Sequence, residues 1–89
     1  MVKIFGQVKH QQGLSSRMCA ELVAEANRAS SCNLTLYSNG EEADLKSIMN
    51  MMSLPMHYEQ EFTIEIVGAD EEAVKTKLEE LLKKLNLLI

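Results

Sequence analysis

The sequence has no tryptophan, one proline and only two cysteines, and these shortages exclude several classes of protein. Two cysteines are too few for a disulfide framework, and the spacing of Cys19 and Cys32 fits neither a zinc knuckle nor a CxxC redox pair. No apolar run approaches the roughly 20 residues that span a bilayer, and the first residues show no signal-peptide pattern. We therefore expect a cytoplasmic protein with reduced thiols and no membrane association.

Positive charge is also scarce, because 9 Lys and Arg stand against 13 Asp and Glu and the formal net charge is -4. A chain without a basic stripe is a poor ligand for phosphate backbones or anionic membranes, so we expect no direct nucleic-acid binding. We expect no metal and no cofactor either. Hydrophobic residues make up 46% of the 89 residues, enough for a thin core, and we expect one domain over residues 1–89.

Apolar and polar residues alternate in four short stretches, which predicts four strands with one buried face each. The apolar positions of these stretches are Val2, Ile4 and Val8, then Leu34 and Leu36, then Ala43 and Leu45, then Phe62, Ile64 and Ile66. Ser38-Asn39-Gly40 predicts a hairpin turn between the second and third strands, because asparagine and glycine accept left-handed backbone.

Helical spacing marks two longer segments, and Ser15 or Ser16 can cap the first. Their predicted buried faces are Cys19, Leu22, Val23 and Ala26, and Val74, Leu78, Leu81, Leu82 and Leu85. A short apolar helix follows Ser47, and Glu71–Lys75, Glu79–Lys83 and Glu80–Lys84 are candidate ion pairs. The order β-α-β-β-α-β-α predicts an α+β open-faced β-sandwich. Its four-stranded antiparallel sheet, with first and last strands adjacent, is covered on one face by three helices.

Three segments carry a family resemblance that extends over essentially the whole chain. They are Gly13-Leu14-Ser15-Ser16-Arg17-Met18-Cys19, the run from Leu45 to Leu54, and the run from Glu65 to Ala73. They resemble the active-site loop, the regulatory-serine segment and the last strand and helix of HPr. HPr is the histidine-containing phosphocarrier of the bacterial sugar phosphotransferase system. The resemblance implies an HPr-like fold, a role in that system and no enzyme activity.

The sequence departs from the family motif Gly-Leu-His-Ala-Arg-Pro-Ala at positions that include the histidine on which the family's phosphate chemistry depends. Ser15 stands at the histidine position and Met18 at the proline position, whereas Gly13, Leu14 and Arg17 match. Phosphoryl relay needs a nucleophile whose phosphorylated form is reactive, and a serine phosphate ester is far more inert than phosphoimidazole. The resemblance therefore implies a member that does not relay phosphate, similar to the catabolite-repression paralogues that lack this histidine and keep the regulatory serine.

Ser47 precedes the short apolar helix and matches the serine that the family's dedicated kinase phosphorylates. A plain N-cap explains the same residue without any kinase, and both interpretations stay open. Beyond Ser47 the helix has too many apolar residues to bury, and Ile48, Met49 and Met52 resemble the family's docking patch. Met51 and Leu54 are expected in the core.

Other polar groups are candidates for a second site. Ser15, Ser16 and Arg17 open a helix, where hydroxyls, N–H groups and a guanidinium form an anion-binding loop, although a cap with a solvated arginine fits equally. Cys19 occupies a position that is alanine in the family, and we expect a buried thiol there. His10 is a possible substitute nucleophile, but the sequence shows no partner that would orient it.

Three hypotheses of function follow. The leading one is a non-catalytic regulatory or partner-binding module of the phosphotransferase system, controlled by phosphate on Ser47. Its partners are proteins of that system or a transcription regulator, together with a serine kinase. The second is an active phosphocarrier that uses Ser15 or His10, and the third is a paralogue with an unrelated partner. Leu87-Leu88-Ile89 either folds back onto the core or forms a self-association edge.

Overall fold

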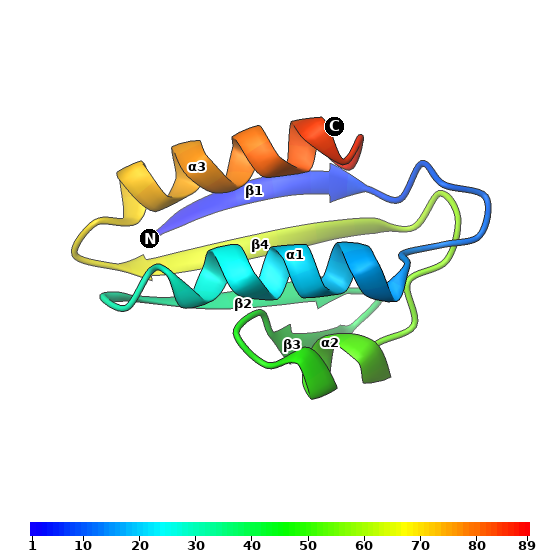
Figure 1. The fold of residues 1–89 in the computed structure, drawn as a ribbon, viewed down its shortest axis with the longest axis horizontal. Coiled ribbons are helices and arrows are strands. Elements are labelled where there is room, and N and C mark those ends of the chain that lie inside the picture. Colours follow the sequence, from blue (N-terminus) through cyan, green and yellow to red (C-terminus); the bar gives the residue numbers. More distant parts are fainter.

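The computed structural model describes residues 1–89 and contains four strands and three helices, in the predicted order (Figure 1). The elements are β1 (Val2–Gln7), α1 (Ser16–Asn27), β2 (Cys32–Ser38), β3 (Glu41–Asp44), α2 (Ile48–Ser53), β4 (Glu61–Gly68) and α3 (Glu71–Lys84). None of the three helices has the length and apolar character needed to cross a lipid bilayer.

The four strands form one antiparallel sheet in the order β1-β4-β2-β3, which confirms that the first and last strands are adjacent. A buried row crosses the sheet, because Ile4 pairs with Ile64, Ile64 with Leu36, and Leu36 with Ala43. Side chains alternate between the two faces of a strand, so this shared register places every predicted apolar position on one face.

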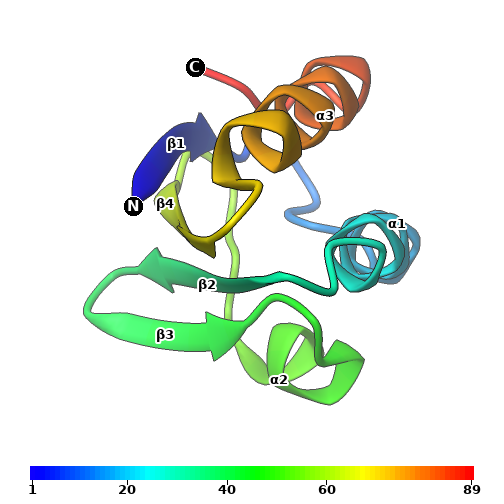
Figure 2. The same cartoon turned by 90° about the vertical axis from the view of Figure 1, so that its left-hand side faces the viewer.

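All three helices cover that apolar face and leave the other face open, as seen in Figure 2. Leu22 and Ala26 of α1 and Leu78 and Leu82 of α3 are buried against the sheet residues in one core cluster. Val23, Val74, Leu81 and Leu85, which were predicted in the buried faces, are only partly buried and lie at the margin of this cluster. The predicted open-faced α+β sandwich is confirmed.

The β2–β3 turn has the predicted hairpin geometry. Asn39 and Gly40 both have left-handed backbone, with φ of 53° and 80°, as a two-residue type I′ turn requires. Ser38 before the turn is buried, and its hydroxyl donates to the carbonyl of Glu61 at 2.7 Å and accepts from the Gln60 amide at 2.7 Å. These two bonds tie the hairpin to the start of β4.

The C-terminal residues fold back onto the core, which resolves the alternative that the sequence left open. Asn86 adopts left-handed backbone, with φ of 59°, and Leu87 N–H donates to the Leu82 carbonyl at 2.8 Å, so α3 ends in a Schellman-type cap. The Leu87 side chain is fully buried. Its carbonyl accepts from Gln7 N–H at 2.8 Å, and Leu88 bridges to Gly6, so this segment covers the free edge of β1.

The three ion pairs of the protein differ from those expected along α3. They join the N-terminal ammonium to Glu71 at 2.7 Å, Lys3 to Glu65 at 3.9 Å and Arg28 to Glu25 at 3.0 Å. The hydrogen bond from the ammonium, followed by one from Gly68 N–H, holds the pKa of Glu71 below its usual value. Exposed ion pairs gain little free energy in water. Favourable i,i+4 spacing was therefore not enough to form the three ion pairs that were expected along α3.

Candidate functional site

The loop over residues 10–18 packs against the segment that follows α2. Gly13 has φ of +81°, and an added Cβ would lie 2.6 Å from the Met56 carbonyl oxygen. Leu14 N–H donates to that same carbonyl at 3.1 Å. Glycine is therefore needed here both for its left-handed backbone and for the close approach of a second chain segment.

Ser15 is the residue that caps α1, which resolves the choice between two serines. Its Oγ accepts from Met18 N–H at 3.2 Å, and its backbone is extended, as an N-cap requires. Ser16 and Arg17 follow as the first helical residues, and all three predicted loop residues are exposed. The geometry leaves the Arg17 guanidinium in solvent and out of any ion pair.

Ser47 is the N-cap of α2. Its Oγ accepts from Asn50 N–H at 3.2 Å and from the Asn50 side-chain amide at 2.8 Å, and the residue is half-buried. The Ser47 oxygen, to which a phosphate group would be attached, therefore already accepts two hydrogen bonds.

Lys46, beside Ser47, secures the connection between β3 and α2. Its Nζ donates to the Ala29 carbonyl at 2.8 Å and to the Cys32 carbonyl at 2.6 Å. Its own carbonyl accepts from the Asn27 amide at 3.0 Å. Because charge-assisted bonds of this kind are stronger than neutral ones, Lys46 holds the backbone at Ser47 against the end of α1.

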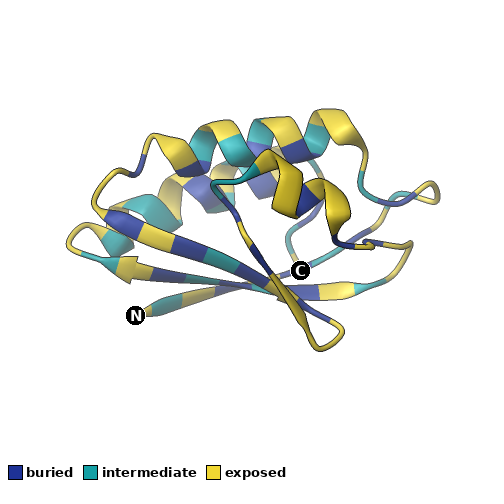
Figure 3. Ribbon diagram, turned by 90° about the horizontal axis from the view of Figure 1, so that it is seen from below, coloured by how far each residue is buried: buried dark blue, intermediate teal, exposed yellow.

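The outer side of α2 is an exposed apolar surface. Ile48, Met49 and Met52 are 41%, 80% and 54% exposed, and we call these three residues the α2 patch. Met51 is the one buried residue of the helix, and Leu54 just after it is buried too, as the sequence predicted. In Figure 3 most of the α2 ribbon has the colour of exposed residues.

The loop over residues 10–18 and the α2 patch both contribute residues to one small cavity. Ser16 and Met52 both line it, and its volume is about 90 Å³. Its other lining residues are Leu14, Cys19, Met51, Leu54 and Met56. Cys19 is buried, as predicted, and burial raises the pKa of its thiol. One predicted loop residue, Ser16, and one patch residue, Met52, are thus brought together at this cavity.

His10 differs from the expectation of an unoriented histidine. Its Nε2 lies 2.8 Å from the carbonyl oxygen of Leu85, and the ring is half-buried. Since a carbonyl only accepts, Nε2 donates to it, and Nδ1 is the ring nitrogen that this bond leaves unused. His10 and Ser15 line the same open pocket. The partner was missed because it lies 75 residues away in sequence.

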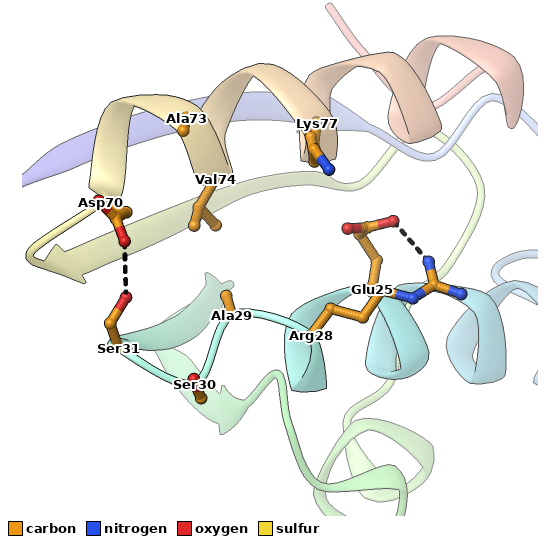
Figure 4. Close-up of a pocket in the computed structure, with 9 residues that line it drawn as sticks. All are labelled: Glu25, Arg28, Ala29, Ser30, Ser31, Asp70, Ala73, Val74 and Lys77. Carbon is orange, nitrogen blue, oxygen red and sulfur yellow. Dashed lines mark hydrogen bonds and ion pairs between the residues drawn. The ribbon is translucent and has the colours of Figure 1, made fainter.

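A second hollow, of about 280 Å³, lies between the end of α1 and the start of α3 and was not predicted (Figure 4). Its charged groups come from separate segments, so no local pattern marks it. Arg28 donates to Glu25 at 3.0 Å, and the Ser31 hydroxyl donates to Asp70 at 3.5 Å. The Arg28–Glu25 pair lies within the end of α1, and the Ser31–Asp70 bond joins the two sides of the hollow, at the end of α1 opposite Ser15.

Comparison with known proteins agrees with this geometry. The family described as "PTS HPr component phosphorylation site" matches residues 6–84. Phosphocarrier protein HPr of Mycoplasma genitalium is 32% identical over 84 residues, covering 94% of this chain and 96% of that protein. HPr-like protein Crh of Bacillus subtilis is 37% identical over 78 residues, covering 88% and 91%.

A solved structure also matches this protein over nearly its whole length. A mycoplasma histidine-containing phosphocarrier protein superposes with a TM-score of 0.90 at 29% identity, covering 98% of each chain. Sequence, length and fold therefore agree over nearly the whole protein. The chain belongs to the HPr family of phosphocarrier-type proteins of the phosphotransferase system.

Proposed function

We propose that this HPr-family protein is a non-catalytic, partner-binding module of the phosphotransferase system, switched by phosphate on Ser47. The observation that carries the proposal is the position of Ser47, which caps α2 directly beside the exposed α2 patch. Residues 1–89 act as one domain whose partners dock on the patch and on the loop at Ser15, Ser16 and Arg17. The partners are proteins of that system or a transcription regulator, and a serine kinase sets the switch.

A phosphate on Ser47 is compatible with the fold. Asn50 offers its N–H and its side-chain amide at the Ser47 oxygen, and phosphate oxygens accept from both. The Ser47 hydroxyl is needed only as an acceptor for the cap, and an ester oxygen with three phosphate oxygens keeps that capacity. Helix α2 is therefore retained when Ser47 is modified.

The added charge changes the surface rather than the fold. The nearest lysine in sequence, Lys46, already directs its ammonium to the carbonyls of Ala29 and Cys32. It is not free to neutralise the phosphate, so close to two negative charges stand at the edge of the α2 patch. Partners that present carboxylates are repelled, and partners that present Arg or Lys are recruited.

We expect the family's serine kinase to label the wild-type protein at Ser47, and Ser47→Asp to change partner affinity about tenfold, or about 1.4 kcal/mol. The melting temperature of Ser47→Asp should change by less than about 4 °C, which corresponds to about 1 kcal/mol in a domain of this size. Kinase labelling, calorimetric binding and thermal melts measure the three quantities.

Ser53→Ala is the matched control for Ser47→Ala, because Ser53 also lies on α2 and is exposed. It should be labelled as fully as the wild type, whereas Ser47→Ala should not be labelled. Absence of label at Ser47 would leave this serine as a helix cap. An identical set of captured partners with and without the phosphate would instead support a paralogue with an unrelated partner.

A second candidate, an active phosphocarrier, is favoured by one observation. The bond to Leu85 leaves Nδ1 of His10 as the free nitrogen in the pocket that Ser15 also lines. This is a tautomer suited to nucleophilic attack. Ser15, by contrast, uses its hydroxyl oxygen to cap α1, where it accepts from Met18 N–H.

We expect no acid-labile label when the protein is incubated with phosphoenolpyruvate and the system's first enzyme, because Ser15 stands where the family carries its histidine. Ser15→His alone should not restore full activity, since Ser16 and Met18 also alter the loop, and a shift of about 1 Å costs on the order of 100-fold in rate. Stoichiometric label that disappears in His10→Ala would establish the second candidate in place of the first.

A further inference from the structure

An open hollow lies on the face of the sheet that the helices leave uncovered (Figure 2), and we call it the sheet-face hollow. Its lining includes Phe5 of β1, Tyr37 of β2 and Thr63 of β4. Thr63 pairs with Phe5 on one side and with Tyr37 on the other, so these three residues form one row across the sheet. The α2 patch and Ser47 belong to the helical layer, so this row is a separate surface.

Two aromatic side chains of this row are exposed on a face whose other positions are mostly polar. Adjacent strands lie about 4.8 Å apart, which places the Cα atoms of Phe5 and Tyr37 about 10 Å apart. Only the smaller Thr63 stands between them. A flat side chain that enters the sheet-face hollow therefore meets aromatic surface, and the exposed Ile89 adds apolar surface at the side of β1.

Carboxylates surround the two rings. Glu61 lines the sheet-face hollow, and Glu42 is the partner of Tyr37 in the β2–β3 register. Glu65 accepts a hydrogen bond from the Tyr37 hydroxyl at 3.5 Å. Desolvation, followed by the negative charges of Glu65 and Glu42, raises the pKa of the Tyr37 phenol, so both carboxylates act on this ring. Three carboxylates thus border the aromatic surface.

Little positive charge balances these carboxylates. Lys3 pairs with Glu65 at 3.9 Å, whereas Glu42 and Glu61 take part in no ion pair. A ligand that carries phosphate or carboxylate groups is repelled by such a surface, so the exposed rings are not a platform for nucleic-acid bases. A cation is attracted by the carboxylates and by the faces of the aromatic rings alike.

We propose that the sheet-face hollow binds an arginine side chain of a partner protein, stacked on the exposed rings of Phe5 and Tyr37 and paired with Glu61. A guanidinium is flat, so it stacks on an aromatic face while its N–H groups donate to carboxylates, which the compact ammonium of lysine does less well. The volume of about 280 Å³ falls just below the range of about 300–1,000 Å³ for drug-sized ligands, which suits a single side chain.

The test is NMR titration of the isotope-labelled protein with the peptide acetyl-Ser-Thr-Arg-Thr-Ser-amide. We expect saturable shifts of the backbone signals of Phe5, Tyr37 and Thr63, and weaker binding at high salt because exposed charges are screened. The same peptide with citrulline in place of arginine has nearly the same shape without the charge. It should bind about threefold more weakly or worse, and so should the lysine peptide.

Two substitutions remove the parts of the site one at a time. Phe5→Leu keeps an apolar side chain without the ring, and Glu61→Gln removes the charge, and each should weaken binding of the arginine peptide about threefold or more. Tyr58→Leu and Glu72→Gln are the matched controls, because both residues are exposed and neither lines the sheet-face hollow. Both should bind as the wild type does. The spectrum of each variant also shows whether it is folded.

Equal affinity for the arginine and citrulline peptides, or unchanged affinity in both Phe5→Leu and Glu61→Gln, would overturn the proposal. A second copy of the protein is the competing source of arginine, because Arg17 is exposed and outside any ion pair. Dilution would then shift the signals of the sheet-face hollow in the wild type but not in Arg17→Ala, and that result would contradict a separate partner. None of these measurements involves phosphate on Ser47, so the result does not depend on the proposed regulatory function.

Discussion

Gly6→Val is expected to destabilise the protein by about 3 kcal/mol or more, a large part of the stability of a small domain. Gly6 is buried in β1, and a Cβ added there would lie 2.2 Å from the Phe62 ring and 2.7 Å from the Leu87 carbonyl oxygen. The ring sits in the core and the carbonyl belongs to the segment that covers the edge of β1. The ring cannot move away without losing its packing in the core, and the carbonyl cannot move away without losing its hydrogen bond from Gln7 N–H.

Urea unfolding of wild type, Gly6→Val and Lys3→Val measures this effect. Lys3 lies on the same strand and is exposed, so valine there should change the free energy of unfolding by less than about 0.5 kcal/mol. Valine favours strands at both positions, and the comparison therefore isolates the close approach. If the two variants unfolded at the same urea concentration, the packing at Gly6 would not be as tight as the distances imply.

The sheet was predictable from sequence because its signal is local. Residues two apart share a face, so Ile64 and Ile66 identify a buried face without knowledge of any partner strand. The pairing of β1 with β4 followed from the order of elements. Such inferences need only the alternation and turn chemistry within a few residues, as at Asn39-Gly40.

Contacts between distant segments were not predictable in the same way. Gly6 shows no turn or left-handed backbone, and its requirement for glycine comes from Phe62 and Leu87. The orientation of His10 depends on a backbone carbonyl at Leu85, which any residue type would supply. No local pattern encodes such partners, because the fold alone brings them together.

The candidate site falls between these cases. The two caps, Ser15 and Ser47, follow from local rules and are confirmed as caps. The exposure of Ile48, Met49 and Met52 followed from the excess of apolar residues on a short helix. The roles of these residues depend on a kinase and on docking partners, which lie outside the chain, so the roles remain predictions.

Leu87→Ala is expected to destabilise the protein by about 2–5 kcal/mol, the range for truncating a fully buried leucine. The substitution removes no backbone group, so any loss of the bond from Gln7 N–H to the Leu87 carbonyl would be a consequence of the lost side-chain packing. Ile89→Ala is the control, because Ile89 is 66% exposed and should contribute less than about 0.5 kcal/mol.

A second measurement on Leu87→Ala distinguishes packing from self-association. When the C-terminal segment loses its anchor, the edge of β1 that it covers is exposed, and a free strand edge pairs with other chains. Size-exclusion chromatography should therefore show dimers or larger species for Leu87→Ala at concentrations where the wild type and Ile89→Ala give one and the same peak. Equal unfolding midpoints for Leu87→Ala and Ile89→Ala would mean that the buried leucine does not fix the segment. The backbone bonds to β1 would then hold it by themselves.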